Sequence, residues 1–289
     1  MSAVTLSSIE PDLIQAIIDR AFEEDLGDRG DITSSYTIPA GKQCKAVIVS
    51  REDGVVSGLE IAQRVFLSMD PTLRVLLHKK DGDRIQKNDA LLTVEGDAHA
   101  VLSAERTALN LLGRMTAISS ATAKFAALVS HTKARISCTR KTTPGLRALE
   151  KYAVHMGGGR NHRFGLYDAV LIKDNHIAVA GDIRAAVQSA IDKNVHGVVI
   201  EVEVDTLEQL DQILDLDIDI VLLDNMPPAQ LVKAIEMVDG KFLTEASGGI
   251  NEDTLVDVAQ TGVDIISLGW ITHSVPWFDV GLDIDILDQ

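Results

Sequence analysis

The stretch Val198–Val204 (VVIEVEV) is followed at Ile218–Leu223 by a second β-branched run, IDIVLL, with a helical apolar pattern between them at Leu207–Leu214. A strand, a helix and another strand in this order predict parallel strands, because a parallel pair needs a crossover connection. The same alternation continues on both sides of this stretch. The other strand candidates are Ala169–Ile172 (AVLI), Lys241–Thr244 (KFLT) and Val263–Leu268 (VDIISL), and the other helical patterns are Ile183–Ile191, Leu231–Val238 and Leu255–Ala259. This recurrence predicts an α/β barrel, closed or partly open.

Each predicted strand ends in a polar residue or a glycine. In α/β barrels the side chains that do chemistry gather at the carboxyl ends of the strands, so we expect these residues to share one rim. In chain order they are Lys173, Glu203, Asp224, Ser247 and Gly269. A further strand at Ala134–Ser137 (ARIS) would add Thr139, Arg140 and Lys141 to the same rim.

The N-terminal part has a different pattern of predicted elements. Its short strand candidates are separated by turn clusters, which indicates an α+β domain. A helical pattern follows over Val101–Ile118, and Arg106 lies off its apolar stripe, toward solvent, a cleft or a partner chain. We therefore expect an N-terminal α+β domain at residues 1–115 and a barrel domain at residues 116–289. It stays open whether the last residues return to the N-terminal domain.

The net charge of the chain is −16 at pH 7, which disfavours a nucleic-acid or anionic-membrane partner. Residues 133–176 differ from the rest, because 9 basic and 3 acidic residues give this segment a charge of +6. Such a segment is often only a solvated basic face. The alternative is a binding site for a small molecule with several negative charges.

The chain contains no apolar stretch long enough for a spanning helix. Its first thirty residues carry Glu10, Asp12 and Asp19, where a signal peptide would be basic and then apolar. Cys44 and Cys138 lie far apart and suggest neither a zinc site nor a disulfide framework. We expect a cytoplasmic protein.

The basic segment has the composition of an anion site. Three glycines, 157–159, precede Arg160, His162 and Arg163, and would let the backbone come close to a ligand that the side chains bind. For His162 a structural role is the alternative. Ser247-Gly248-Gly249 follows a predicted strand and precedes a helical pattern, as phosphate sites in barrels do, although short glycine-rich turns are also common at strand ends.

Carboxylates follow on the neighbouring strands. Glu203 and Asp224 can hold Mg²⁺ or bind sugar hydroxyls. Glu201 lies on the same strand face as Glu203, and it either shares this function or only neutralises the nearby cations.

Several of these segments resemble the quinolinate phosphoribosyltransferase family. TRKTTPGLR (139–147), LIKDNH (171–176) and EASGGI (245–250) stand in the family's order and spacing, and the likeness covers nearly the whole chain. The further matching pieces are Glu24–Gly27, Gly30–Thr33, Glu105–Asn110, Lys151–Ala153, Asn161–Arg163, Glu201–Val204, Leu222–Asn225 and Thr261–Asp264.

The resemblance implies an N-terminal α+β domain followed by an incomplete, open α/β barrel of the type II phosphoribosyltransferase kind. It also implies transfer of a phosphoribosyl group from 5-phosphoribosyl 1-pyrophosphate to quinolinate with Mg²⁺ as cofactor, which gives nicotinate mononucleotide, pyrophosphate and carbon dioxide. The family works as a homodimer or a multiple of it, and Arg106 matches the arginine that is lent to the partner's site.

By the same match, Thr139, Arg140, Lys141, His162, Arg163 and Lys173 would bind the dicarboxylate and the pyrophosphate. Glu203 and Asp224 would hold the ribose hydroxyls, directly or through Mg²⁺, and Ser247, Gly248, Gly249 and Gly269 would hold the 5′-phosphate. The residues expected to take part in catalysis are Lys141, Lys173, Glu203 and Asp224. Trp270 and Cys138 depart from the family pattern, and Trp270 would narrow the phosphate end.

This chemistry agrees with the charges. The quinolinate ring nitrogen has no proton to lose, so attack on the ribose carbon needs orientation and charge stabilisation more than a general base. Two other functions stay open from the residues alone. One is a barrel lyase or aldolase in which Lys173 forms a Schiff base with a phosphorylated carbonyl compound, and the other is a non-catalytic binding paralogue.

Overall fold

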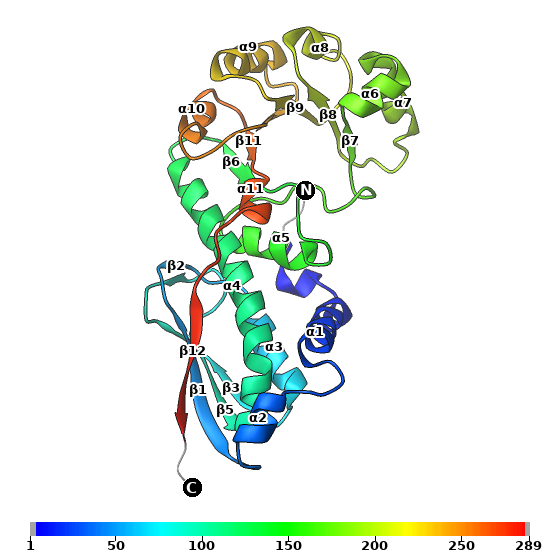
Figure 1. Cartoon of the computed structure of the whole chain (residues 1–289). Coiled ribbons are helices and arrows are strands. Elements are labelled where there is room, and N and C mark those ends of the chain that lie inside the picture. Colours follow the sequence, from blue (N-terminus) through cyan, green and yellow to red (C-terminus); the bar gives the residue numbers. More distant parts are fainter. Residues whose placement is uncertain (1–3, 287–289) are drawn as a thin grey trace. The chain divides into compact units, whose positions relative to one another are not determined.

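The computed structural model describes residues 4–286, which form two compact units (Figure 1). The barrel unit contains residues 122–142 and 159–273, and the N-terminal unit contains residues 4–121, 143–158 and those from 274 onward. The long helix α4 (Ala98–Leu128) begins in the N-terminal unit and ends in the barrel unit.

The barrel unit is built on a six-stranded sheet in which every neighbouring pair is parallel. The strand order is β6-β11-β10-β9-β8-β7, so β6 and β7 are the two edges of an open sheet. This confirms the predicted incomplete α/β barrel. The strands are β6 (Arg135–Ser137), β7 (Val170–Ile172), β8 (Ile200–Val204), β9 (Ile220–Asp224), β10 (Leu243–Ser247) and β11 (Ile265–Ser267).

The bounds predicted for one strand were wrong. KFLT was expected at Lys241–Thr244, whereas β10 begins at Leu243 and continues through Ser247, which pairs with Asp224 of β9. The polar residues Glu245 and Ser247 made the second half look like a loop. They belong to the strand because Glu245 is buried in the interior of the unit, at 1% exposure.

Except for the short α11 (Trp270–His273), the helices of this unit lie on the outer side of the curved sheet in Figure 1. Two of them begin at side-chain caps, where Asp182 accepts a hydrogen bond from the Ala185 amide and Thr206 accepts one from the Gln209 amide. The helices are α6 (Asp174–Ala180), α7 (Ile183–Lys193), α8 (Leu207–Asp211), α9 (Pro228–Val238), α10 (Leu255–Gln260) and α11 (Trp270–His273).

The N-terminal unit contains an antiparallel sheet in the order β12-β1-β5-β3. Its last strand in the chain, β12 (Val280–Ile286), pairs with β1 (Gln43–Ser50) along almost its whole length. The other elements are a 3₁₀ turn η1 (Leu6–Ser8), α1 (Pro11–Leu26), α2 (Ile32–Thr37), β2 (Gly54–Val55), α3 (Leu59–Met69), β3 (Arg74–Leu77), β4 (Arg84–Ile85), β5 (Ala90–Asp97) and α5 (Arg147–Met156).

The two units are not separated by one cut. The expected boundary between residues 115 and 116 falls inside α4, and residues 143–158, expected in the barrel domain, belong to the N-terminal unit. Side chains of α5 contact other residues of the N-terminal unit, and Tyr152 donates to Asp81 at 2.8 Å. Glu150 accepts hydrogen bonds from Nε and Nη2 of Arg114 at 3.0 and 2.8 Å. Residues 1–3 and 287–289 of the two predicted domains lie outside the described residues.

Across residues 4–286, every helix is too short or too polar to cross a membrane.

Candidate active site at the carboxyl ends of the barrel strands

A cavity of about 360 Å³ opens where the parallel strands of the barrel unit end. It brings together nine side chains predicted from the sequence to form the site. They are Thr139, Arg140, Lys141, His162, Arg163, Lys173, Glu203, Asp224 and Ser247. The remaining lining residues are Leu171, Leu222, Glu245 and Ser267.

Two guanidinium groups, those of the half-buried Arg140 and the buried Arg163, contribute positive charge to the cavity. Arg163 is 6% exposed, and its Nη1 donates to the carbonyl of Ala169 at 3.1 Å. Among residues 4–286, the buried Nε atoms of Arg140 and Arg163 find no acceptor. Burial, and then the charge of Arg140, lower the pKa of Arg163. Because buried donors without acceptors are costly, the pair favours an anionic ligand.

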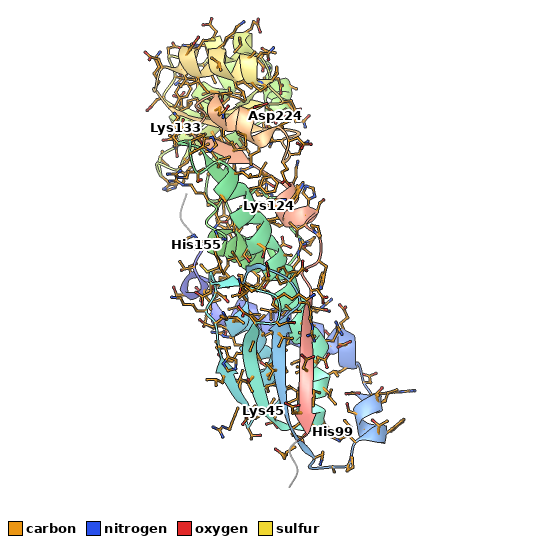
Figure 2. The ribbon with its side chains drawn as sticks, turned by 90° about the vertical axis from the view of Figure 1, so that its left-hand side faces the viewer. Lys45, His99, Lys124, Lys133, His155 and Asp224 are labelled. Atoms are coloured by element: carbon orange, nitrogen blue, oxygen red, sulfur yellow. The ribbon has the colours of Figure 1, made fainter. Side chains whose placement is uncertain are left out.

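The opposite charge comes from two adjacent strands. Glu203 is the last residue but one of the buried strand β8 and forms an ion pair with Nζ of Lys173. Asp224 ends β9 (Figure 2). Burial raises the pKa of Glu203, Lys173 acts against this, and the charge of Asp224 adds to it. Asp224 also accepts a hydrogen bond from Nδ2 of Asn225 at 2.5 Å. Carboxylate oxygens that repel one another in this way suit a hard cation such as Mg²⁺.

The Ser247-Gly248-Gly249 turn packs directly against the end of β9. The Asn225 amide donates to the Ser247 carbonyl at 2.9 Å. Gly248 has φ +92°, and a Cβ at this position would lie 2.2 Å from Oδ1 of Asn225. A glycine is therefore required by both the backbone conformation and the lack of space. Of the four residues expected at the 5′-phosphate, Ser247 lines the cavity described above, whereas Gly248, Gly249 and Gly269 do not.

A cluster of buried ionisable groups lies deeper in the barrel. Nε2 of His162 is 3.0 Å from Oε2 of Glu201 on β8 and 3.6 Å from Oε1 of Glu245 on β10. The Arg163 amide donates to Nδ1 of the same ring, which places the ring proton on Nε2, toward the carboxylates. Ser267 of β11 donates to Oε1 of Glu245. Burial, and then the charge of Glu201, raise the pKa of Glu245 to about 7.

Glu245 and Ser267 were missed in the sequence. A period of two along a strand could have found them, because each lies two residues before a predicted rim residue, Ser247 or Gly269, and so shares its face. For Glu201 the sequence left two roles open, a share in the function of Glu203 or neutralisation of the nearby cations. The structure places it in direct proximity to His162.

Three further residues have defined surroundings. Arg106 is exposed on α4 in the N-terminal unit, whereas Ala104 and Ala108 of the same helix are buried. The ring of Trp270 packs edge-on against Phe125, with the centroids 5.1 Å apart, and it is not among the lining residues of the cavity. Cys138 is buried and its thiol donates to Oδ1 of Asn161 at 3.3 Å.

Comparison with known proteins gives consistent matches along the chain. Residues 31–116 match the model of the quinolinate phosphoribosyl transferase N-terminal domain, and residues 118–283 match that of the C-terminal domain. The chain is 41% identical over 276 residues to the probable nicotinate-nucleotide pyrophosphorylase [carboxylating] of Bacillus subtilis, which covers 96% of this chain and 95% of that one.

Two other relatives extend the comparison. The nicotinate-nucleotide pyrophosphorylase [carboxylating] of Mycobacterium leprae is 44% identical over 287 residues, which is 96% of this chain and 100% of that one. The solved structure of the nicotinate-nucleotide pyrophosphorylase from Francisella tularensis superposes with a TM-score of 0.93 at 34% identity, covering 99% of this chain and 100% of that one.

Proposed function

The chain belongs to the quinolinate phosphoribosyltransferase family, and we propose that its barrel cavity is where quinolinate is joined to 5-phosphoribosyl 1-pyrophosphate. The enzyme is a pentosyltransferase of NAD biosynthesis. Its products are nicotinate mononucleotide, pyrophosphate and carbon dioxide. The observation that carries the assignment of the site is the pair of guanidinium groups of Arg140 and Arg163, whose buried Nε donors have no acceptor among the described residues.

Different groups of side chains in the cavity bind different parts of the two substrates. Arg140 and Arg163, with His162 and Lys173, hold the dicarboxylate, because a guanidinium fork matches a carboxylate. Glu203 and Asp224 hold the ribose hydroxyls at the neighbouring strand ends. Thr139, Lys141, Ser247, Gly248, Gly249 and Gly269 hold the pyrophosphate and the 5′-phosphate.

The cavity performs the transfer by positioning and by charge. The ring nitrogen of quinolinate carries a lone pair and no proton, so it attacks the ribose carbon without a base once the two are aligned. Pyrophosphate leaves with its negative charge stabilised by Lys141 and the surrounding cations. The ring nitrogen is then cationic and holds the electron pair that carbon dioxide leaves on the adjacent carbon.

We propose Mg²⁺ as the cofactor, held by Glu203 and Asp224. The donor set fits, because both groups are carboxylates on adjacent strands and Asp224 already raises the pKa of Glu203. When bound, the ion would neutralise charge on the ribose-pyrophosphate. Treatment with a chelator should abolish activity and added Mg²⁺ should restore it, whereas full activity after chelation would contradict this cofactor.

We also propose a cytoplasmic homodimer, or a multiple of it, in which Arg106 completes the partner's site. The exposure of Arg106, away from the buried stripe of α4 that contains Ala104 and Ala108, supports this arrangement. The acidic net charge of −16 supports the absence of nucleic-acid and membrane partners.

The test of the function is release of labelled carbon dioxide. Quinolinate labelled in the 2-carboxyl group is mixed with the folded enzyme, 5-phosphoribosyl 1-pyrophosphate and Mg²⁺. Equal amounts of carbon dioxide and nicotinate mononucleotide are expected, and no label should be released without the pyrophosphate substrate. Folded enzyme that releases no label would refute the function. Borohydride should trap no adduct on Lys173, since a trapped adduct would indicate a Schiff-base lyase.

A further inference from the structure

The proposed reaction consumes a proton at a defined atom. When the 2-carboxylate leaves as carbon dioxide, the bond to the ring breaks and its electron pair stays on that ring carbon. The product carries hydrogen there. An acid must therefore reach this carbon inside a site whose substrate is anionic, and the transfer step itself releases no proton.

Glu245 has the surroundings of a group that holds such a proton. It lines the cavity with 1% exposure, and Ser267 donates to its Oε1. Glu201 is fully buried, and its Oε2 lies 3.0 Å from Nε2 of His162. Two buried carboxylates therefore approach one imidazole, at 3.0 and 3.6 Å. Ionising both acids in such a site is unfavourable, so a proton is retained.

We propose that Glu245, held beside Glu201, His162 and Ser267 in the cavity wall, takes up a proton when the dicarboxylate binds and donates it to the ring carbon after carbon dioxide leaves. This inference rests on the proposed function. It assigns Glu245 as a further catalytic residue and Glu201 as a positioning residue that acts through it.

Binding of quinolinate favours the protonated form of Glu245. The charged groups that act on Glu245 are Glu201, which raises its pKa, and His162 and Lys173, which lower it. A bound dianion adds negative charge nearby and engages the cations, and both effects favour protonated Glu245. The proton then forms the new C–H bond with the electron pair left on the ring, Glu245 becomes a carboxylate, and water restores its proton in the next cycle.

The first test counts protons on binding. Quinolinate is titrated into the full-length enzyme, without 5-phosphoribosyl 1-pyrophosphate, by calorimetry at pH 8 in HEPES and in Tris, which differ in ionisation enthalpy. Wild type should take up about half a proton or more, because the pH lies roughly one unit above the pKa of free Glu245. E245Q should take up none. Unchanged uptake in E245Q would show that another group, such as His162, binds the proton, and would overturn the proposal.

The second test separates binding from turnover. E245Q removes a negative charge from an anion site, so the Kd for quinolinate should stay equal or fall, while kcat falls about 100-fold. A merely structural defect would weaken binding as well. An unchanged kcat would refute the catalytic role. The matched control is D264N, which alters a partly buried carboxylate of the same unit that precedes β11, and it should change neither proton uptake nor kcat.

A third variant decides the matter if E245Q does not fold. S267A removes the hydrogen bond that lowers the pKa of Glu245, so the pH at which proton uptake is half-maximal should rise. A midpoint that stays or falls would contradict the proposal. Failure of the function itself looks different: wild type would then neither bind quinolinate nor release labelled carbon dioxide.

Discussion

Arg163 is buried, and only some of its guanidinium N–H donors have acceptors in the protein. Nη1 reaches the Ala169 carbonyl, and Nε has no acceptor among the described residues. A lysine would keep the charge and lose the planar arrangement of donors, because an ammonium is a point charge on a flexible stem. The identity of this side chain should therefore affect the recognition of a carboxylate more than the net charge does.

Arg163→Lys should raise the KM for quinolinate about 10- to 100-fold, the effect of losing one or two hydrogen bonds to a charged group. The KM for 5-phosphoribosyl 1-pyrophosphate should change little. Steady-state kinetics with each substrate varied in turn measures both constants. Arg184→Lys is the control, since Arg184 is exposed and pairs with Asp215, outside the cavity. Equal KM values for wild type and R163K would remove Arg163 from the dicarboxylate site.

For single residues, the sequence predicted which side chains line the cavity better than it predicted their contacts with one another. Nine of the lining side chains were predicted, because polar residues at strand ends are visible in the sequence. The pairing of His162 with Glu201 and Glu245 was not predicted, since it joins a loop to two strands that are not adjacent in the sheet. Spacing within one segment contains no information on such contacts.

The turn after β10 shows how one element fixes the position of another. Gly248 lies against Asn225, which itself has a positive φ of +55° and donates from Nδ2 to Asp224. A side chain at residue 248 would displace Asn225, and with it both the Ser247 turn and the orientation of Asp224.

Gly248→Ala should raise the KM for 5-phosphoribosyl 1-pyrophosphate at least about 10-fold, because a positive φ costs an L-residue about 1–2 kcal/mol even before the contact with Asn225 is counted. The Kd of quinolinate should change much less. Gly181→Ala serves as the control, since Gly181 has φ +100° and nothing within 4 Å of its Cβ position. If both variants show the same kinetics, crowding at Gly248 has no role in substrate binding.

Helix α2 depends on a single capping side chain. Asp31 accepts hydrogen bonds from the Ser34 amide at 2.9 Å and from Ser103 of α4 at 3.2 Å, and the bond from the Ser34 hydroxyl contributes most to lowering the pKa of Asp31. Because this pKa is lowered on folding, the stabilisation is present above the ordinary pKa and is lost as the pH falls through the lowered value.

Asp31→Ala should therefore reduce the free energy of unfolding by about 1–2 kcal/mol at pH 7. As the pH falls through the lowered pKa of Asp31, the difference from wild type should shrink, because Asp31 then becomes protonated in the folded chain as well as in the unfolded chain. Urea unfolding followed by circular dichroism at pH 7 and at a series of lower pH values measures this. Asp31→Asn keeps the cap and should stay close to wild type, and an equal loss in both variants would show that capping is not the cause.

The elements themselves were largely predictable where apolar periodicity was strong. The helix over α4 was found, although the predicted pattern ends at Ile118 and α4 ends at Leu128, and the strands β8 and β9 were found with ends shifted by at most about two residues. The end of β10 was not, because its interior-facing glutamate interrupts the apolar run.

At the scale of the whole molecule the units interleave along the chain. The sequence showed an α+β pattern followed by alternating strands and helices, and from this change a single domain boundary was predicted. It did not show that residues 143–158 join the N-terminal unit, because contacts of α5 in that unit, such as that between Arg114 and Glu150, join residues 36 positions apart. The basic TRKTTPGLR segment is consequently shared, with residues 139–142 in the barrel unit and residues 143–147 in the other.

A mixture of two inactive variants tests the assembly. Arg106→Ala and Lys173→Ala should each abolish most turnover while both stay folded. If Arg106 acts in the partner's site, a mixed dimer has one site with both defects and one intact site. Random exchange of subunits should then restore about a quarter of wild-type activity. Labelled subunits can verify that mixed dimers form, and mixed dimers without activity would refute a shared site.

The pairing of β12 with β1 has a consequence for the newly made chain. On the ribosome, β1 is synthesised early, whereas its neighbour β12 follows the entire barrel unit. At ordinary rates of translation the interval is on the order of ten seconds or more. During this time one edge of the N-terminal sheet has unpaired backbone groups that neighbouring nascent chains can add to. Chaperone occupancy during synthesis should therefore begin at the N-terminal segment and end when β12 emerges.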